Sequence, residues 1–415
     1  MEKTWFKEPK YAWIGLASLW LIGFIGSLTR FIMAFFQVQI AEDLQINRGF
    51  ISMAWSTNLL IAACCVPVGG WLVDRYGPKK VMAVSAVMGI LGTGIVMLGD
   101  GPVVFFIGYG VISGLAGIGA TTTYQLMFEW FQHHRAKATA LLMSASSIGL
   151  AVSTPIFVST GWLTWKDAFT ASFILGILVT LPVIWLGIKS PQQSRENKLE
   201  KSVHGPGHSP VARPASTNKA MRLSILTLVA CALFTCGFNM STAEMNLVAI
   251  HQLAKVSPNM IAISMSVLGV MEITGSLIFG YLLDRTNKLL IMMVLYGVRI
   301  IGFSFLFMHV GWSPLLFAVT FGITYLSAVP GGLLVVNELA KGSGKQTGFL
   351  LLFHNGGGII GAMIGGISFD YFNNYQVLIG ANVLICTLIM LGYFLLLTAG
   401  RRRNVALQSK EVSLT

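Results

Sequence analysis

The chain has 415 residues, of which 54% are hydrophobic and 11% are charged. Soluble domains carry about 25% charged residues, so this composition excludes an ordinary soluble globular protein and indicates an integral membrane protein. The formal net charge of +12 would favour nucleic acid as a partner of a soluble chain. In so hydrophobic a chain we instead expect no nucleic acid and a charge that orients the protein in the lipid bilayer.

Twelve stretches of mainly apolar residues are each long enough to cross a hydrocarbon core of about 30 Å as a helix. We expect helices at 13–40, 50–73, 80–99, 102–127, 137–158, 168–188, 223–249, 258–283, 289–309, 313–336, 346–370 and 376–399. The first is longer than a signal-peptide core and is followed by no small-residue cleavage site, so we expect it to be retained. All five cysteines lie inside these stretches, and their spacing predicts neither a disulfide nor a metal site.

Basic residues are unevenly distributed among the predicted loops. If both termini are cytoplasmic, the outer loops hold only Arg48, Lys166 and Lys255, while the cytoplasmic segments hold the great majority of the lysines and arginines. This is the positive-inside asymmetry of membrane proteins. We therefore predict a multi-pass protein of the inner or plasma membrane with both termini in the cytoplasm.

A polar and basic segment at residues 190–222 divides the twelve stretches into two sets of six. This segment contains Pro, Gly and Ser and has too little apolar surface to form a packed core, so it reads as a cytoplasmic linker. We expect one six-helix bundle within residues 1–189 and a second bundle, followed by a cytoplasmic tail, within 223–415.

The two halves share a motif. GGWLVDRYGPKK at 69–80 and FGYLLDRTNKLL at 279–290 both place Gly-x-Leu-x-Asp-Arg at a predicted helix end. A repeat in the same orientation, six helices apart, indicates two bundles related by an axis along the membrane normal, with a substrate site between them near mid-membrane. The glycines would allow close helix approach and the aspartates would cap a neighbouring helix to close the cytoplasmic side, although either copy could be a solvated charge pair. The candidate gating residues are Gly70, Asp74, Arg75, Gly77, Lys79, Gly280, Asp284 and Arg285.

At these residues the chain resembles the major facilitator superfamily, whose loop motif is matched by Gly70, Asp74, Arg75, Gly77, Lys79 and Lys80. The resemblance extends over all twelve stretches. It implies an all-α membrane protein of the major facilitator fold, in which two six-helix bundles rock to give alternating access, usually driven by a proton or solute gradient. The second copy departs from the motif after Arg285.

Further stretches are similar to the monocarboxylate-porter-like branch of that superfamily. WFQHHRAKATA at 130–140 looks like the opening of its fifth helix, and RFIMAFF at 30–36 looks like the first-helix stretch that carries a substrate-linked cation. By this match Arg30 takes the role of the cation, and Glu272 stands where the branch carries an acidic residue. The branch has a carboxylate-binding arginine where this chain has Ser276, so anion recognition would rest on Arg30, with Arg299 and His354 the other available cations.

The residues themselves also single out Arg30. An arginine near the centre of a bilayer helix costs at least ~2.5 kcal/mol, so it must snorkel, pair or face a polar cavity. Gln37 lies seven residues further on the same helical face, which predicts a polar stripe directed at a central cavity. We expect Arg30 to contact an anionic substrate; the alternative is a structural ion pair with Glu244 or Glu272.

Other polar residues within the predicted helices are also candidates for the site, and some of them have an alternative structural role. We expect substrate contacts from Tyr124, Gln125, Asn239 and His354, against a place in the interfacial belt for Tyr124 and a hydrogen bond between helices for His354. Burial disfavours the charged form of a carboxylate and lets it load and release a proton, so Glu272 and then Glu244 are the candidates for proton coupling. Arg299 belongs to a helix expected at the bundle periphery, where an ion pair or snorkelling is favoured.

The sequence thus predicts a monomeric secondary transporter that moves a small organic anion, of the monocarboxylate type, by alternating access with proton symport. Its partners would be the small-molecule substrate, protons and the lipid bilayer, without a cofactor. No nucleophile and base stand at a spacing typical of an enzyme. The alternatives are a proton-coupled exporter of drugs or amphipathic compounds and a non-transporting membrane sensor.

Overall fold

The computed structural model of the protein describes residues 8–131, 135–188, 219–340 and 344–412. Within these ranges twelve helical stretches are long and apolar enough to cross a membrane, which confirms the predicted all-α membrane fold. Their ends lie within a few residues of the predicted ones. The predicted linker, however, extends too far, because a helix already begins at Lys219; residues 189–218 lie outside the described part of the chain.

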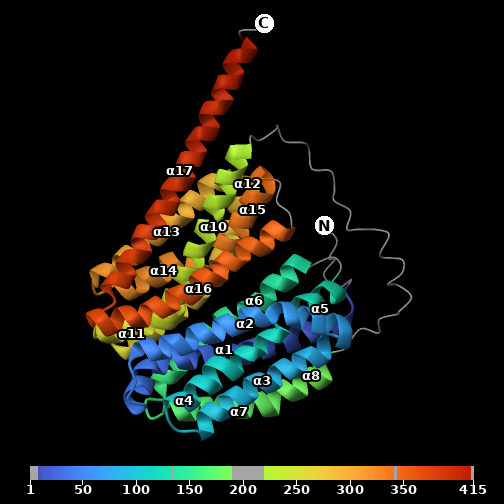
Figure 1. Ribbon diagram of the computed structural model, residues 1–415, viewed down its shortest axis with the longest axis vertical. Helices are drawn as coiled ribbons and strands as arrows, with labels where there is room; N and C mark the ends of the chain where they lie inside the picture. Colours follow the sequence, from blue (N-terminus) through green and yellow to red (C-terminus); the bar gives the residue numbers. More distant parts are fainter. Residues whose placement is uncertain (1–7, 132–134, 189–218, 341–343, 413–415) are drawn as a thin grey trace.

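The first six spans form the N-terminal half of the molecule (Figure 1). Four spans are single helices, and the fourth and sixth spans are divided by changes of helix type. The elements are α1 (Lys10–Asp43), α2 (Arg48–Tyr76), α3 (Pro78–Leu98), α4 (Pro102–Phe105), η2 (Phe106–Ile112), η3 (Ser113–Gly119), α5 (Thr122–Trp130), α6 (Arg135–Ser159), α7 (Trp165–Leu175), η4 (Gly176–Thr180) and α8 (Leu181–Gly187).

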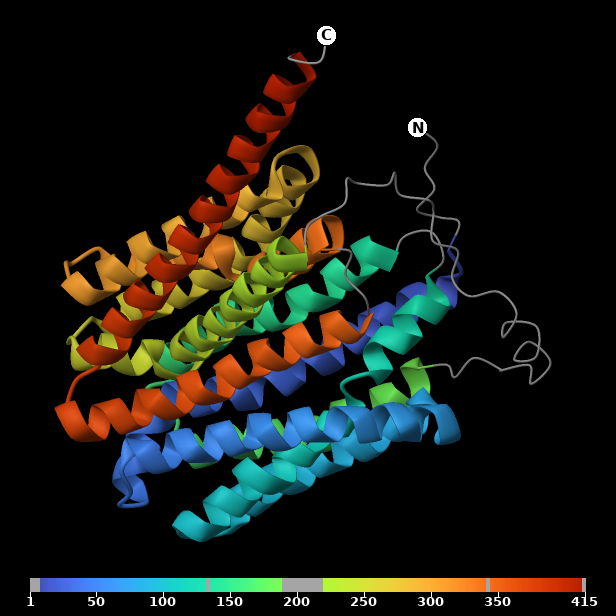
Figure 2. The same cartoon turned by 45° about the horizontal axis from the view of Figure 1, so that its top comes forward.

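The remaining six spans form the C-terminal half, which lies beside the first in both views (Figures 1 and 2). Its last helix extends well beyond its neighbours. The elements are α10 (Lys219–Ser241), η5 (Thr242–Asn246), α11 (Leu247–Leu253), α12 (Pro258–Arg285), α13 (Lys288–Met308), α14 (Ser313–Tyr325), α15 (Ala328–Ala340), α16 (Gly344–Phe372) and α17 (Gln376–Val412).

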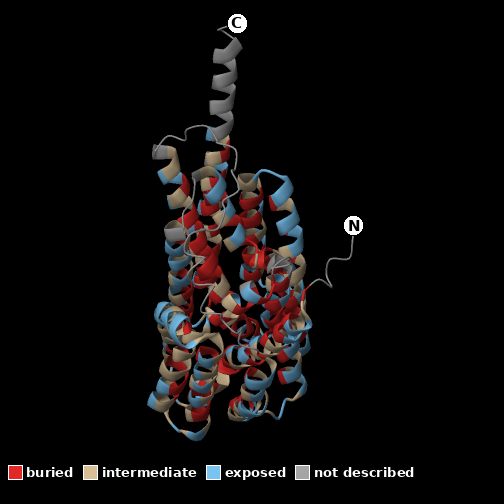
Figure 3. Ribbon diagram, turned by 90° about the vertical axis from the view of Figure 1, so that its right-hand side faces the viewer, coloured by how far each residue is buried: buried red, intermediate tan, exposed pale blue. Residues whose placement is uncertain are grey.

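Large apolar side chains cover the outside of the bundle, while the buried residues gather between the helices (Figure 3). Leu186 is 83% exposed, and Leu178 and Leu277 are each 67% exposed. In water such a surface would be an aggregation hazard. In a bilayer the same side chains contact lipid, and every helical backbone group keeps its internal hydrogen bond.

The two halves are joined at one end of the bundle and separate at the other. We name the end where α1 begins the terminal side and the other end the loop side. One hydrophobic core, which includes Phe31, Trp55, Met245 and Phe321, runs across both halves towards the loop side, whereas the terminal side has a separate core in each half. The halves pack through α2 with α16 and α6 with α12.

The repeat seen in the sequence is also visible at the helix ends. Asn47 caps the start of α2 by accepting a hydrogen bond from the Phe50 N–H, and Ser257 does the same for α12 with the Met260 N–H. These two caps occupy the same place in the two halves. The repeated motif therefore belongs to helices that also begin in the same way.

Candidate functional site

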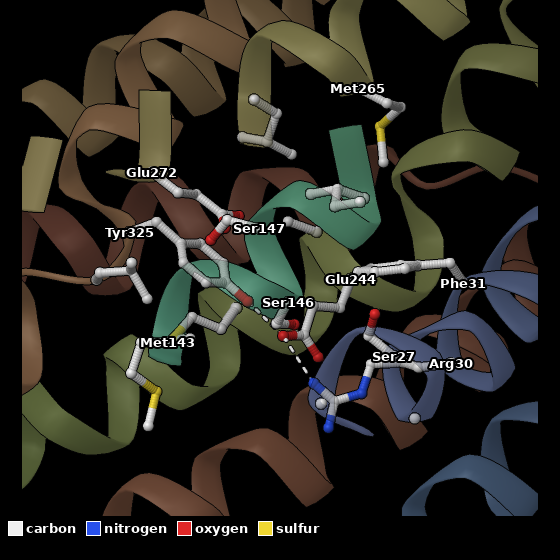
Figure 4. Close-up of a pocket in the computed structure, with 17 residues that line it drawn as sticks. Ser27, Arg30, Phe31, Met143, Ser146, Ser147, Glu244, Met265, Glu272 and Tyr325 are labelled. Atoms are coloured by element: carbon white, nitrogen blue, oxygen red, sulfur yellow. Dashed lines mark hydrogen bonds and ion pairs between the residues drawn. The ribbon is translucent and has the colours of Figure 1, made fainter. Parts of the chain in front are cut away.

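A cavity of about 400 Å³ lies between the halves and contains Arg30 (Figure 4). The N-terminal half contributes α1 and α6 to its wall, and the C-terminal half contributes α10, η5, α12 and α14. Among the described residues that line it, Arg30 is the one basic side chain and Glu244 and Glu272 are the acidic ones. The arginine thus faces a cavity formed by both halves, as the sequence predicts.

The guanidinium of Arg30 forms an ion pair with Glu244 of the other half, with 3.5 Å between Nη1 and Oε1. This separation exceeds the 2.7–3.2 Å typical of N–H···O hydrogen bonds, so the contact is loose. The Arg30 side chain also keeps 43% of its surface accessible. The alternative of an ion pair with Glu244 is therefore present, but Arg30 retains free donors that face the cavity.

Tyr325, at the end of α14, donates its hydroxyl hydrogen to the same Glu244 oxygen, Oε1 (Figure 4). One carboxylate oxygen therefore joins a helix of the N-terminal half to two elements of the C-terminal half. A hydrogen bond to an ionised acceptor is about twice as strong as one between neutral groups, so Tyr325 holds Glu244 in position. Sequence reasoning missed Tyr325; it ends α14 just before a two-residue break in the span, and Pro330, in the first turn of the next helix, is the signal that could have found it.

Glu244 lies in η5, a π-helical turn that interrupts the seventh span. A π turn inserts an extra residue into the helix and is frequently found at functional sites. Around this turn Asn239 and Thr242 both bond to Asn382 of α17, whereas Asn246 lies against Gly365 of α16. Helical periodicity alone could not reveal this.

Glu272 lines the same cavity and is only 4% exposed. Ser147 of α6 donates its hydroxyl hydrogen to the Glu272 carboxylate at 2.6 Å, again across the two halves. The sequence did not identify Ser147, which lies in a run of small residues typical of helix packing.

Gln37 and Asn239 line none of the described cavities. The amide of Gln37 donates to the backbone carbonyl of Met245 at 2.5 Å, so it joins α1 to the π turn. Asn239 is fully buried and bonded to Asn382 and Arg299 within the C-terminal half. Both amides are engaged with protein groups.

Tyr124 and Gln125 also lie outside the described cavities, and the Tyr124 side chain is 39% exposed. His354 lines a second cavity, of about 310 Å³, together with Arg30 and Glu244. Its Nδ1 lies 3.2 Å from the carbonyl oxygen of Leu233, so the alternative, a hydrogen bond between helices, is present. Of these three residues, the structure brings only His354 close to the Arg30 site.

The expectation for Arg299 is wrong. Its side chain is 0% exposed and lies inside the C-terminal half, where it neither snorkels nor forms an ion pair with a described carboxylate. Its guanidinium donates to Asn239 Oδ1 and to the backbone carbonyls of Thr324 and Tyr325, and it lies over the Phe321 ring. The sequence could not show that neighbouring helices supply these acceptors.

The first copy of the repeated motif forms a helix end on the terminal side. Gly77 has φ of +85°, which favours glycine, and Pro78 begins α3. Lys79 donates to the backbone carbonyl of Trp185 at 2.7 Å, and Arg75 lies over Trp71. These contacts stay within the N-terminal half.

The closing contacts predicted for the motif are absent from this conformation. A Cβ atom added at Gly70 or Gly280 would meet nothing within 4 Å, so neither glycine is a point of close helix approach. Asp74 and Asp284 are exposed and make no hydrogen bond or ion pair with another described residue, while Arg285 lies over the Tyr281 ring. On the terminal side, where both copies of the motif lie, each half has its own hydrophobic core.

The fold and this site between two six-helix halves define a membrane transporter. The family model described as Major Facilitator Superfamily matches residues 19–362. The chain belongs to the major facilitator superfamily and is a transporter, not an enzyme.

The chain is similar to several transporters. The uncharacterized MFS-type transporter YcxA of Bacillus subtilis is 25% identical over 90% of this chain and 92% of its own. The hexuronate transporter of B. subtilis is 23% identical over 86% of this chain and 88% of its own. Monocarboxylate transporter 12 of Mus musculus is 21% identical over 77% of this chain and 72% of its own. Among solved structures, the nucleoside transporter NupG has the same fold, with a TM-score of 0.71, 14% identity and coverage of 92% of this chain and 99% of that chain.

Proposed function

We propose that the protein carries a small organic anion, of the monocarboxylate type, across the plasma membrane in symport with a proton. The observation that carries this proposal is Arg30, a half-accessible guanidinium within the central cavity, held only loosely by Glu244 at 3.5 Å. Relatives named for hexuronate and for monocarboxylate, both carboxylates, support an anionic substrate.

Coupling to a proton follows from the charge on Glu244. A substrate carboxylate competes with Glu244 for the guanidinium of Arg30. Protonation of Glu244 removes this competitor, so a proton and an anion load together and the net charge of the site stays unchanged. Glu244 therefore takes precedence over Glu272, which has no contact with Arg30 and remains a second site for a proton.

Alternating access follows from the asymmetry between the two ends of the bundle. With the terminal side in the cytoplasm, the structure corresponds to an inward-open conformation, in which α2 with α16 and α6 with α12 close the outside. Asp74 and Asp284 would find partners only when the halves close on the terminal side. The substrate would then be exposed to the opposite side of the membrane.

The test is uptake of labelled pyruvate and lactate into proteoliposomes under an imposed proton gradient. We expect uptake by the wild type to depend on the gradient. Uptake should fall at least about ten-fold in Arg30→Gln, because loss of a hydrogen bond to a charged group costs about 1.5–3 kcal/mol of binding free energy. Lys166→Gln is the matched control. It removes a cation paired with Asp100 outside the cavity, and it should transport within about two-fold of the wild type.

The same assay distinguishes the alternatives. The cavity also has two carboxylates and an apolar lining that includes Met143, Met240 and Met265, which would suit an amphipathic cation. Transport of such cations without any carboxylate would contradict the proposal and favour an exporter. Binding of carboxylates without flux would instead favour a sensor.

A further inference from the structure

A separate cavity, of about 360 Å³, lies inside the N-terminal half and extends from Arg30. Helices α1, α2 and α3 enclose it, together with parts of the fourth and sixth spans. Gly26 and Arg30 line both this N-half cavity and the central cavity. A ligand bound to Arg30 could therefore occupy the two spaces at once.

The N-half cavity differs from the central cavity in the chemistry of its wall. It has no carboxylate among its described lining residues, and Arg30 is its one charged side chain. Its wall is instead rich in hydroxyl and amide groups. They include Thr29, Asn58, Ser85, Thr93, Ser172 and Thr180.

Several of these groups have already used a hydrogen-bond donor. The hydroxyl of Ser85 donates to the carbonyl of Ala116 at 2.6 Å, and that of Thr93 donates to the carbonyl of Gly89 at 2.8 Å. The amide of Asn58 likewise donates to the carbonyl of Tyr109 at 2.8 Å. Lone pairs remain on the oxygens of Ser85, Thr93 and Asn58, so these three groups present acceptors to whatever fills the cavity, and Asn58 keeps a second N–H as a donor.

A ligand that satisfies such a wall must supply donors. Carbon-bound hydroxyl groups are donors without charge, and an anion with a hydroxylated tail combines them with a carboxylate for Arg30. A three-carbon monocarboxylate would leave this space to water, whereas cavities that bind small molecules commonly measure about 300–1,000 Å³. The size of the combined space therefore favours a longer and hydroxylated substrate.

We propose that the N-half cavity is a subsite for the hydroxylated tail of a carboxylate substrate whose carboxylate binds Arg30. This inference rests on the proposed anion transport and specifies its substrate class as a polyhydroxylated carboxylate. Within this subsite, we assign to Thr93 the selection of substrates that have a hydroxylated tail. The relative named a hexuronate transporter is named for an acid of this class.

The test is binding of D-gluconate and of propionate to the purified full-length protein, measured by titration calorimetry in detergent. Thr93→Val removes one hydroxyl group at nearly constant shape. Thr387→Val is the matched control, because Thr387 in α17 makes the same bond to a carbonyl four residues earlier, at 2.8 Å, outside the described cavities. We expect Thr93→Val to weaken the binding of gluconate by about three- to ten-fold and the binding of propionate by less than about two-fold. Thr387→Val should change neither affinity.

Gly89→Leu provides a second variant that fills the N-half cavity. A Cβ atom at Gly89 would lie 3.9 Å from that of Ala116, an ordinary contact, so the added side chain can be accommodated. We expect this variant to abolish the binding of gluconate and to leave the binding of propionate unchanged. Equal effects of both variants on the two acids, or none on either, would overturn the subsite while leaving anion binding intact. If the wild type binds neither acid, the proposed function fails and the subsite with it.

Discussion

The carboxylate of Asp370, at the end of α16, accepts a hydrogen bond from the backbone N–H of Gly49, at the start of α2, with 2.8 Å between the heavy atoms. It also accepts one from the Arg48 N–H at 3.1 Å. The first N–H groups of a helix have no partner within the helix, and an anion placed there interacts favourably with the helix dipole. A residue of one half thus caps a helix of the other half and ties the loop side closed.

This cap predicts that Asp370→Ala loosens the loop side. Helix caps contribute about 1 kcal/mol, so the ratio of closed to open molecules should fall about five-fold. A Ser52→Cys probe in a background without the native cysteines can report this by its rate of labelling with an impermeant maleimide, because Ser52 is 1% exposed and lies against Gly366 of α16.

Asp100→Ala serves as the control for the cap. It also removes a surface carboxylate, but the partner of Asp100, Lys166, belongs to the same half. We expect labelling of the Ser52→Cys probe to stay unchanged in this variant. Equal labelling in Asp370→Ala and Asp100→Ala would contradict the role of the cap.

The contact between Glu244 and Arg30 predicts a separation of coupling from binding. Glu244→Gln leaves Arg30 without a charged competitor, so we expect exchange of carboxylate across the membrane to continue while proton-driven accumulation is lost. Wild-type uptake should rise as the pH on the loading side falls, because the proposed symport carries a proton with each anion, and the variant should lose this dependence. Counterflow and gradient-driven uptake, measured on the same proteoliposomes, test both statements.

Glu272→Gln is the matched comparison. Glutamine keeps an acceptor for the Ser147 hydroxyl, which lies 2.6 Å from the Glu272 carboxylate, so the packing of α6 against α12 should survive. We expect accumulation within about three-fold of the wild type. The reverse pattern, with accumulation lost in Glu272→Gln and kept in Glu244→Gln, would transfer the coupling role to Glu272.

Two tyrosines that undergo the same chemical change should give opposite results. Tyr325→Phe removes the hydroxyl that donates to Glu244, and a hydrogen bond to a charged group contributes about 1.5–3 kcal/mol, so we expect transport to fall about ten-fold or more. Tyr124→Phe should transport within about two-fold of the wild type, because Tyr124 lies outside the described cavities. Initial rates of uptake at matched protein amounts decide the comparison. A large loss in Tyr124→Phe would restore the substrate contact predicted from the sequence.

Arg299 should matter for stability and not for substrate recognition. Arg299→Gln leaves several buried acceptors, including the carbonyls of Thr324 and Tyr325, without their donor, and we expect it to lower the free energy of unfolding by about 2–4 kcal/mol. Thermal unfolding in detergent measures this loss. In protein that remains folded, KM should stay close to that of the wild type, and a changed KM would place Arg299 in the substrate site.

The sequence by itself determined the number of membrane-spanning helices, their approximate ends and the family. Each span needs only about 20 apolar residues, and each helix satisfies its own backbone hydrogen bonds, so local composition is enough. The repeated Asp-Arg motif likewise depends on a short local pattern. Arg30 could be identified for the same reason, because a charge in the middle of a span is costly wherever its partner lies.

The partners of these residues were decided only by the tertiary structure. The contacts of Arg30 with Glu244, of Ser147 with Glu272 and of Arg48 with Asp370 each join residues more than a hundred positions apart. Helical periodicity placed Gln37 on the same face as Arg30, but a face does not say whether it meets a cavity or a neighbouring helix. The π turn at Glu244 and the packing of the two halves decide that, because they set the rotation of each helix about its own axis.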